Sequence, residues 1–342
     1  MSDLSVVVLA AGQGKRMYSD LPKVLHPLGG RPLLSHVVST ALELHPARVV
    51  VVYGHGGRTV PERLASLPAQ WVEQARQLGT GHAVAQAMPA VADADTVLVL
   101  YGDVPLTRAE TLRDLVALAG PDALALVTVD LEVPTGYGRV IRDGAGRVLR
   151  IVEEKDATPA ERAVREVNTG ILAAPAGRLR AWLAGLGNDN AQGEYYLTDV
   201  IARAVAEGLP VRTVQPGALA EVLGVNNRLQ LAELERAYQR RQAERLLLAG
   251  VALADPARLD VRGEVTAGRD VFLDVNVVLE GRVVLGDRVR VGPGTVLRDA
   301  EVGEGAEIGA HCVIEGASVR PGSRLDPFSW VRAGTGSGTR VP

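Results

Sequence analysis

The sequence is poor in cysteine, in aromatic residues and in excess charge of either sign. Its 342 residues include a single cysteine, Cys312, which excludes an intrachain disulfide and predicts a reducing, cytoplasmic location. Aromatic residues make up 4% of the chain, too few for the base-stacking platforms of single-strand-binding proteins. A formal net charge of -3 offers no general attraction for nucleic acid. No nucleic-acid partner is therefore predicted.

Long apolar runs and targeting segments are also lacking. No run of about 18 apolar residues occurs, so no membrane span and no membrane partner are predicted. The first apolar run, 6–11, follows no basic segment and ends at Gly12, which favours a strand over a signal peptide. Hydrophobic residues make up 47% of the chain and charged residues 23%, which is the composition of an ordinary globular protein. The length is too great for one ordinary core and predicts two domains.

Short apolar runs alternate with amphipathic segments over residues 1–225. The predicted buried strands are 6–11, 49–53, 96–101 and 124–129, and the predicted helices include 33–44, 83–91 and 109–119. This alternation predicts an α/β domain of Rossmann-like type, with a mixed, mostly parallel sheet and helices on both faces. Ligands of such sheets bind beyond the carboxyl ends of the strands. The loops after residues 11 and 101 are expected to meet there.

The pattern changes after residue 225. Residues 226–250 predict a linker helix. Its predicted apolar stripe consists of Leu229, Leu231, Leu234, Tyr238, Leu246, Leu247 and Leu248. Beyond it, over 251–332, apolar residues recur every six positions, with one slip of a single residue before Val302. A six-residue period predicts a parallel β-helix, and hexapeptide coils of this kind usually wind left-handed.

The repeats are followed by no capping element, which a solenoid requires. The β-helix is therefore expected to be truncated. Residues 333–342 are rich in glycine, serine and threonine and are expected to form a disordered tail.

The loop after the first strand has the features that a triphosphate requires. Leu9-Ala10-Ala11-Gly12 ends the strand in small residues, which let the backbone approach a ligand closely. Arg16 and Lys23 follow and supply positive charge for phosphate oxygens. The spacing fits neither a P-loop nor the dinucleotide-binding fingerprint. A plain glycine turn with solvated cations is the alternative that this segment alone leaves open.

Four other groups of residues are candidates for ligand binding. The Gln74 amide could pair with a nucleobase, with Gly79 allowing close approach; the alternative is a loop in which Thr80 caps a helix. Asp103, after the strand 96–101, suits Mg²⁺, which takes one or two carboxylates plus phosphate oxygens and water; the alternative is an Asx turn. Asn226, before the linker helix, would ordinarily be a cap.

The fourth group consists of three segments, Gly136-Tyr137-Gly138-Arg139, Glu153-Glu154-Lys155-Asp156 and Asn168-Thr169-Gly170. A carboxylate and an amide beside glycine turns can hold sugar hydroxyls. Taken alone, these residues fit ordinary hairpin turns and a solvated charge run better.

Together these motifs resemble those of sugar-phosphate nucleotidylyltransferases. The resemblance is carried by residues 9–17, 22–25, 77–82, 101–105 and 224–228, with the hexapeptide repeats behind them. Over residues 4–332 the chain is similar to the bifunctional bacterial family of N-acetylglucosamine-1-phosphate uridylyltransferase/glucosamine-1-phosphate N-acetyltransferase. Lys15 stands where that family more often has threonine, a departure that we expect to be tolerated.

The resemblance implies Mg²⁺-dependent transfer of UMP from UTP to N-acetylglucosamine 1-phosphate. The products would be pyrophosphate and UDP-N-acetylglucosamine, a precursor of peptidoglycan and lipopolysaccharide. It implies catalytic roles for Arg16 and Lys23, and Mg²⁺ ligation by Asp103 and Asn226. The residues that it implies in substrate binding are Leu9, Ala10, Ala11, Gly12, Lys23, Gln74, Gly79, Thr80, Tyr101, Gly102, Asp103, Gly138, Glu153, Asn168, Asn226 and Arg332.

The family's second activity, acetylation of glucosamine 1-phosphate by acetyl-CoA, is predicted to be absent. Of the residues that serve it in the family, only Arg332 has a counterpart here. The family forms homotrimers through its β-helix, and we expect that assembly to be weakened. The alternatives are a pyrophosphorylase for another sugar and nucleotide, a hexapeptide acyltransferase, and a regulatory subunit, which would be expected to lack Lys23 or Asp103.

Overall fold

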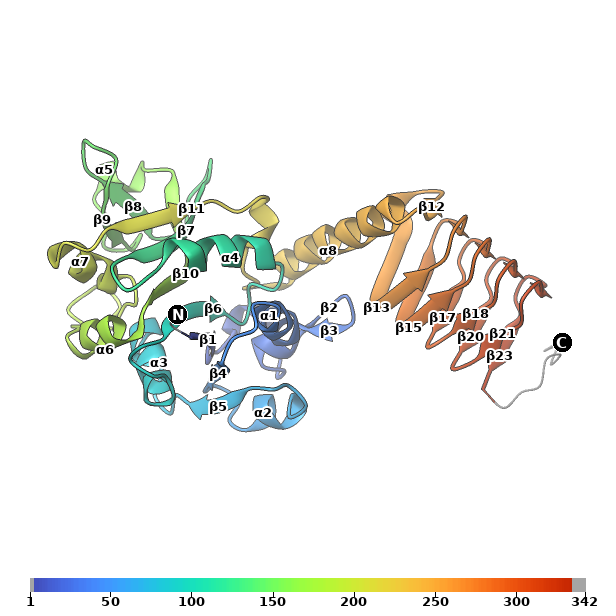
Figure 1. Cartoon of the computed structure of the whole chain (residues 1–342), viewed down its shortest axis with the longest axis horizontal. Coiled ribbons are helices and arrows are strands. Elements are labelled where there is room, and N and C mark those ends of the chain that lie inside the picture. The colour runs from blue at the N-terminus through green and yellow to red at the C-terminus, as the bar shows by residue number, and fades with distance from the viewer. Residues whose placement is uncertain (1–2, 334–342) are drawn as a thin grey trace. The chain divides into compact units, whose positions relative to one another are not determined.

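The computed structural model describes residues 3–333, which form two compact units (Figure 1). The sheet unit comprises residues 3–26 and 32–230, and the coil unit comprises 27–31 and 231–333. The predicted disordered tail lies, apart from Ala333, outside the described residues.

A nine-stranded mixed sheet organises the sheet unit. Along its main path the strands are β11 (Val211–Val214), β7 (Leu124–Asp130), β10 (Glu166–Pro175), β6 (Thr96–Tyr101), β1 (Leu4–Ala10), β4 (Arg48–Tyr53) and β5 (Gln70–Glu73). β1 is parallel to both of its neighbours, whereas β10 is antiparallel to β6 and β7. A hairpin of β8 (Arg139–Arg142) and β9 (Val148–Val152) extends from β10. The predicted α/β class with a mixed sheet is confirmed.

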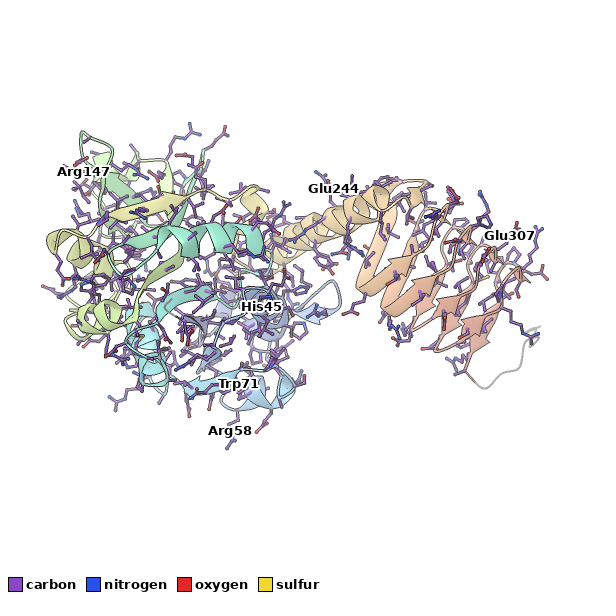
Figure 2. All side chains as sticks on the ribbon, in the orientation of Figure 1. His45, Arg58, Trp71, Arg147, Glu244 and Glu307 are labelled. Atoms are coloured by element: carbon purple, nitrogen blue, oxygen red, sulfur yellow. The ribbon has the colours of Figure 1, made fainter. Side chains whose placement is uncertain are left out.

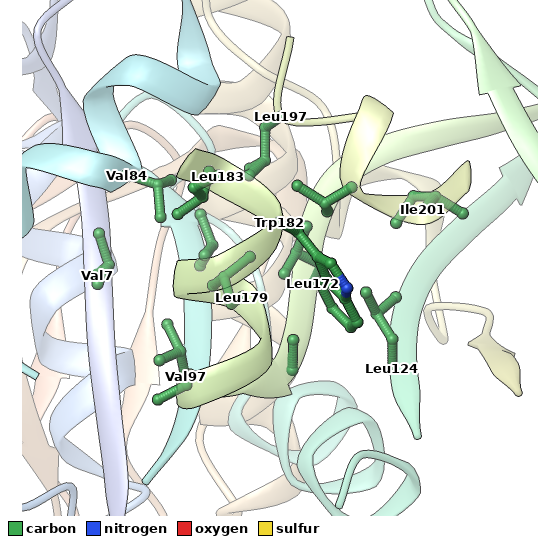
Figure 3. Packing of buried hydrophobic residues seen from close by; sticks show 14 of the residues in the cluster. Val7, Val84, Val97, Leu124, Leu172, Leu179, Trp182, Leu183, Leu197 and Ile201 are labelled. Carbon is green, nitrogen blue, oxygen red and sulfur yellow. The ribbon is translucent and has the colours of Figure 1, made fainter. Parts of the chain in front are cut away.

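Apolar side chains divide between the two faces of this sheet because successive strand residues point in opposite directions. Val7 of β1 joins one hydrophobic cluster, and Val6 and Val8 join the other. Figure 3 shows the first cluster, in which α6 packs its buried Leu179 and neighbouring side chains among strand residues. The α-helices of the unit are α1 (Leu33–Leu42), α2 (Thr59–Arg63), α3 (Thr80–Ala87), α4 (Ala109–Leu118), α5 (Pro159–Arg162), α6 (Ala176–Ala184) and α7 (Asp199–Ala206).

Several short elements complete the description. The 3-10 helices are η1 (Lys15–Met17), η2 (Lys23–Leu25), η3 (Met88–Ala90), η4 (Leu219–Glu221) and η5 (Pro256–Arg258). β2 (Pro27–Leu28) and β3 (Arg31–Pro32) pair with each other.

The coil unit consists of α8 (Arg228–Leu248), apart from its first residues, and of stacked parallel strands (Figure 1). One sheet contains β12 (Ala252–Leu253), β14 (Phe272–Leu273), β16 (Arg290–Val291), β19 (Glu307–Ile308) and β22 (Arg324–Leu325). The other contains β13 (Leu259–Ala267), β15 (Val277–Leu285), β17 (Val296–Arg298), β18 (Glu301–Val302), β20 (Val313–Glu315), β21 (Ser318–Val319) and β23 (Trp330–Arg332).

The strand register explains the six-residue period. Val261 pairs with Leu279, eighteen residues further along, which is three hexapeptides. Leu297 pairs with Ile314, only seventeen residues further along, and the shorter step accounts for the slip in the repeat. This parallel pairing fits the coils of a β-helix, whose handedness stays a prediction.

The apolar stripe predicted for the linker helix was wrong in part. Leu234, Tyr238 and Leu246 are buried as predicted, whereas Leu229, Leu247 and Leu248 are exposed. The buried side of α8 instead includes a polar residue, Gln239, whose amide donates to the Val261 carbonyl oxygen (2.9 Å) and accepts from the Val261 N–H (2.7 Å). A polar side chain can be buried there because the strand backbone satisfies its hydrogen bonds.

Charged side chains cover the surfaces of both units. Figure 2 shows Arg58 and Arg147 projecting from the sheet unit and Glu307 from the coil unit. Among the helices of residues 3–333, none combines the length and the apolarity that crossing a bilayer requires.

Close stacking of the coils predicts that a methyl group at Gly263 is not tolerated. A Cβ atom there would lie 2.1 Å from the carbonyl oxygen of Gly281, its partner in the next coil. Gly263→Ala should lower the free energy of unfolding by about 3 kcal/mol or more, because backbone atoms must move to relieve the clash. Gly305→Ala is the control: space is open there, and only its left-handed φ of 66° is penalised, by about 1 kcal/mol. Calorimetric melting that shifts equally in both variants would contradict the stacking argument.

Candidate active site

The loops after β1 and β6 meet, as the sequence predicted. The two strands are parallel, with Leu9 opposite Tyr101, and the Gly102 N–H donates to the Leu9 carbonyl oxygen (2.9 Å). Leu9, Ala10 and Ala11 are buried, whereas Gly12 is exposed. A Cβ atom at Gly12 would have no atom within 4 Å, so a ligand could approach its backbone freely.

Three of the predicted residues come together beside these loops. The Lys23 ammonium forms an ion pair with the Asp103 carboxylate and lies 3.4 Å from Asn226 Oδ1. Asn226 is brought there because the Val225 N–H donates to the Asp103 carbonyl oxygen (2.9 Å). The Lys23 and Asp103 side chains are only 13% and 17% exposed, so water screens the pair weakly.

This arrangement fits the Mg²⁺ site that the resemblance implies. A carboxylate oxygen of Asp103 and the amide oxygen of Asn226 both approach one cationic centre, the Lys23 ammonium. Hard oxygen ligands of this kind, one or two from the protein with the rest from phosphates and water, are what Mg²⁺ requires. Residues 3–333 contain no group of three or more His, Cys, Asp or Glu side chains that could hold a metal ion. A metal here would therefore depend on substrate oxygens.

Arg16, the other predicted catalytic cation, is placed differently. It lies in η1, and its side chain is exposed. Within residues 3–333 no hydrogen bond or ion pair of this side chain is found. The structure thus joins Lys23 to Asp103 and leaves the Arg16 guanidinium available to an anionic ligand.

The residues predicted to bind a nucleobase lie together in the loop before α3. Gln74 is 3% exposed, and its amide Nε2 donates to the Gly79 carbonyl oxygen (3.1 Å). Gly79 has a left-handed φ of 108°, and a Cβ atom there would lie 2.6 Å from the Tyr195 carbonyl oxygen. Thr80 is the first residue of α3 and does not cap it; its hydroxyl accepts from the Leu197 N–H (3.1 Å).

The residues predicted to hold a sugar form a second group. Both carboxylate oxygens of Glu153 lie 3.4 Å from the position of a Cβ atom at Gly138. The Asn168 N–H donates to the Gly138 carbonyl oxygen (2.9 Å), and Asn168 Oδ1 accepts from the Gly170 N–H (3.1 Å). The Tyr101 ring closes this side, 2.5 Å from the position of a Cβ atom at Gly170.

Burial raises the pKa of two of these groups. Burial raises the pKa of Glu153, and the charges of Asp199 and Asp156 add to this, while a hydrogen bond from Thr198 (3.0 Å) opposes it. Burial raises the pKa of Tyr101, and the carboxylates of Glu153 and Asp103 raise it further. Tyr101 therefore keeps its proton at neutral pH and remains a hydrogen-bond donor.

Sequence reasoning gave no role to Arg139, which is 2% exposed. Its guanidinium donates to the Tyr137 carbonyl oxygen and to Glu154 Oε1 (3.2 Å). The other oxygen of Glu154 accepts from the Gly136 N–H (2.6 Å). Arg139 thus ties the loop that carries Gly138 to the segment that carries Glu153. The sequence offered no signal for this, because an arginine before an apolar strand is ordinarily solvated.

Arg332 contacts two residues of the coil unit. On β23 it donates to Glu315 Oε2 (3.1 Å), and its guanidinium lies 3.9 Å from the centroid of the Trp330 ring. All the other predicted site residues belong to the sheet unit. These contacts do not test the predicted absence of acetyl transfer, which stays a prediction.

The contacts of Arg139 predict a selective defect. Arg139→Lys keeps the charge but loses the fork that reaches both Tyr137 and Glu154. We expect the KM for the sugar 1-phosphate to rise tenfold or more, with the KM for the nucleotide within about twofold. The control is Arg142→Lys, which changes the other arginine of β8 and alters its ion pair with Glu166 of β10. Equal changes in both KM values, or none, would contradict the positioning role.

Comparisons with known proteins identify relatives of this chain. The MobA-like NTP transferase domain matches residues 6–249. The bifunctional protein GlmU of Azoarcus sp. (strain BH72) is 60% identical over 328 residues, which cover 96% of this chain and 69% of that protein. The bifunctional protein GlmU of Dechloromonas aromatica (strain RCB) is 62% identical over 278 residues, or 81% of this chain and 61% of that protein.

Two solved structures share the fold. A nucleotidyl transferase from Methanothermobacter thermautotroptrophicus superposes with a TM-score of 0.53 at 21% identity, and UDP-glucose pyrophosphorylase complexed with UDP-glucose with 0.56 at 15%. Each comparison covers 70% of this chain and 100% of the other. On the strength of the domain match and of the high identity to these relatives, the chain belongs to the GlmU family of nucleotidyltransferases.

Proposed function

We propose that the sheet unit catalyses Mg²⁺-dependent transfer of UMP from UTP to N-acetylglucosamine 1-phosphate. The observation that carries this proposal is the sharing of the Lys23 ammonium by Asp103 and Asn226, beside the open backbone at Gly12. Relatives named bifunctional protein GlmU, at about 60% identity, support the choice of substrates.

The proposed reaction needs no general base. The nucleophile is an oxygen of the sugar phosphate, which is already ionised at neutral pH because its second pKa is about 6. It forms a new bond to the α-phosphorus of UTP, while the bond from that phosphorus to the bridging oxygen breaks and pyrophosphate leaves. Catalysis of this step therefore rests on positioning and on neutralising charge.

Positive charge in the site would act on the phosphates. Mg²⁺, held by Asp103 and Asn226, would supply neutralisation of phosphate oxygens when bound. The Lys23 ammonium lies against both oxygens, so it would stand beside the bound phosphates and neutralise charge on the triphosphate. Arg16, exposed on the same loop, would stabilise the departing pyrophosphate.

The two neighbouring groups of residues would hold the ends of the product. Uridine would be bound by Gln74, Gly79, Thr80 and the backbone of Leu9-Ala10-Ala11-Gly12. Gly138, Glu153, Asn168 and the protonated Tyr101 would hold the sugar, because together they offer donors and acceptors suited to hydroxyl groups. Left-handed winding of the coils, a homotrimer and a cytoplasmic location are further proposals that accompany this function.

Pyrophosphate release from UTP and N-acetylglucosamine 1-phosphate, with and without Mg²⁺, tests the proposal. We expect turnover only with Mg²⁺, and the highest kcat/KM for this pair in a panel of other nucleotides and sugar phosphates. Asp103→Ala should lower kcat by a hundredfold or more, because it removes a carboxylate that faces the cation. The control is Asp114→Ala, which changes an exposed residue of α4. Mg²⁺-dependent turnover that survives Asp103→Ala within twofold would exclude the metal assignment.

The exposed guanidinium of Arg16 gives a separate prediction. If it meets charge that develops on the phosphates, Arg16→Ala should lower kcat/KM for UTP about a hundredfold, or roughly 3 kcal/mol. Lys15→Ala, which removes the neighbouring exposed cation, should change it less than threefold. A loss below twofold in Arg16→Ala would remove this residue from the mechanism.

A further inference from the structure

We infer that His82 is a positioning residue that gives the site its preference for uracil over cytosine. The inference rests on the proposed uridine site and concerns the orientation of the Gln74 amide. Gln74 Nε2 lies 3.1 Å from the Gly79 carbonyl oxygen and 2.9 Å from His82 Nδ1.

The Gly79 carbonyl identifies the two ends of the amide. A backbone carbonyl can only accept, so the Gln74 group that faces it must be the NH₂ group. The second N–H of that group points to His82 Nδ1, which must then be the unprotonated ring nitrogen. Burial lowers the pKa of His82, which favours the neutral ring that this contact requires.

The rest of the His82 ring can satisfy this tautomer. With Nδ1 accepting, the proton lies on Nε2, where the half-buried Gln86 amide is 3.3 Å away. That amide can turn its oxygen toward the ring, since its other contact, to the His82 carbonyl oxygen, is long at 3.5 Å. The His82 ring also lies 6.5 Å from the Tyr195 ring, measured between centroids.

Both N–H groups of the Gln74 amide are thereby used, and its oxygen remains. Within residues 3–333 no hydrogen bond to Gln74 Oε1 is found. Position N3 of uracil carries a proton and can donate to this oxygen, whereas N3 of cytosine carries a lone pair and would oppose it. To bind cytosine, the Gln74 amide would have to rotate so that its NH₂ group faces N3 of the base. The Gln74 amide oxygen would then face two other acceptors, the Gly79 carbonyl oxygen and His82 Nδ1. Each of these two acceptors therefore increases the preference for uracil over cytosine.

The test compares kcat/KM for UTP and CTP in the full chain. His82→Leu removes the acceptor and should lower the UTP to CTP ratio about tenfold or more. His82→Asn can place its amide oxygen near the position of Nδ1 and should keep the ratio within threefold. In His82→Gln the side-chain amide reaches toward the position of Nε2 instead, so the UTP to CTP ratio should fall as it does in His82→Leu. This variant replaces His82→Leu if that protein fails to fold. Where turnover of a variant is too slow to measure, the ratio of the dissociation constants of UDP and CDP, measured by calorimetry, replaces the ratio of kcat/KM values.

The outcomes separate the inference from the proposed function. Wild-type turnover of UTP together with an unchanged ratio in His82→Leu and His82→Gln would overturn the role of His82 alone. Equal use of UTP and CTP by the wild-type chain would do the same. Failure of the folded wild-type chain to turn over UTP with any sugar phosphate would remove the proposed function, and the inference with it.

Discussion

One interaction joins the parts of the candidate site: the Lys23 ammonium held between the Asp103 carboxylate and the Asn226 amide oxygen. These residues are 80 and 203 positions apart from Lys23 in sequence, so the interaction links the loop after β1, the end of β6 and the segment before α8. Because the ion pair is poorly exposed, loss of either partner would leave a charge with little solvation.

The groups on either side of this charged centre consist mainly of hydrogen-bonding amides and hydroxyls, with the Glu153 carboxylate among them. Tyr101 connects them: Thr80 on the nucleobase side partly opposes the rise in the Tyr101 pKa, and the Tyr101 ring packs against Gly170 on the sugar side. Its raised pKa keeps it a donor between two carboxylates. The site thus separates its tasks, with cations at the phosphates and oriented dipoles at both ends of the product. Preorganised dipoles of this kind recognise a ligand without reorganisation during the reaction.

Sequence patterns predicted what local periodicity can encode. Unbroken apolar runs located the central strands, and the six-residue repeat located the stacked coils, including the slip that the seventeen-residue step explains. They did not show which polar groups are buried. Arg139 and Gln239 are buried because backbone carbonyls and N–H groups distant in sequence receive them, and no local pattern records such partners. The role of His82 is hidden for the same reason, since it depends on which acceptors face Gln74.

The central claim is that the two oxygens now shared by Lys23 are the protein ligands of a divalent cation. Anomalous diffraction from a crystal of this chain grown with Mn²⁺ and UDP-N-acetylglucosamine tests it most directly. The account predicts one strong peak within bonding distance of both Asp103 and Asn226 side-chain oxygens, with the Lys23 ammonium withdrawn from them. A peak bound only by phosphate oxygens, with the Lys23–Asp103 ion pair intact, would contradict it.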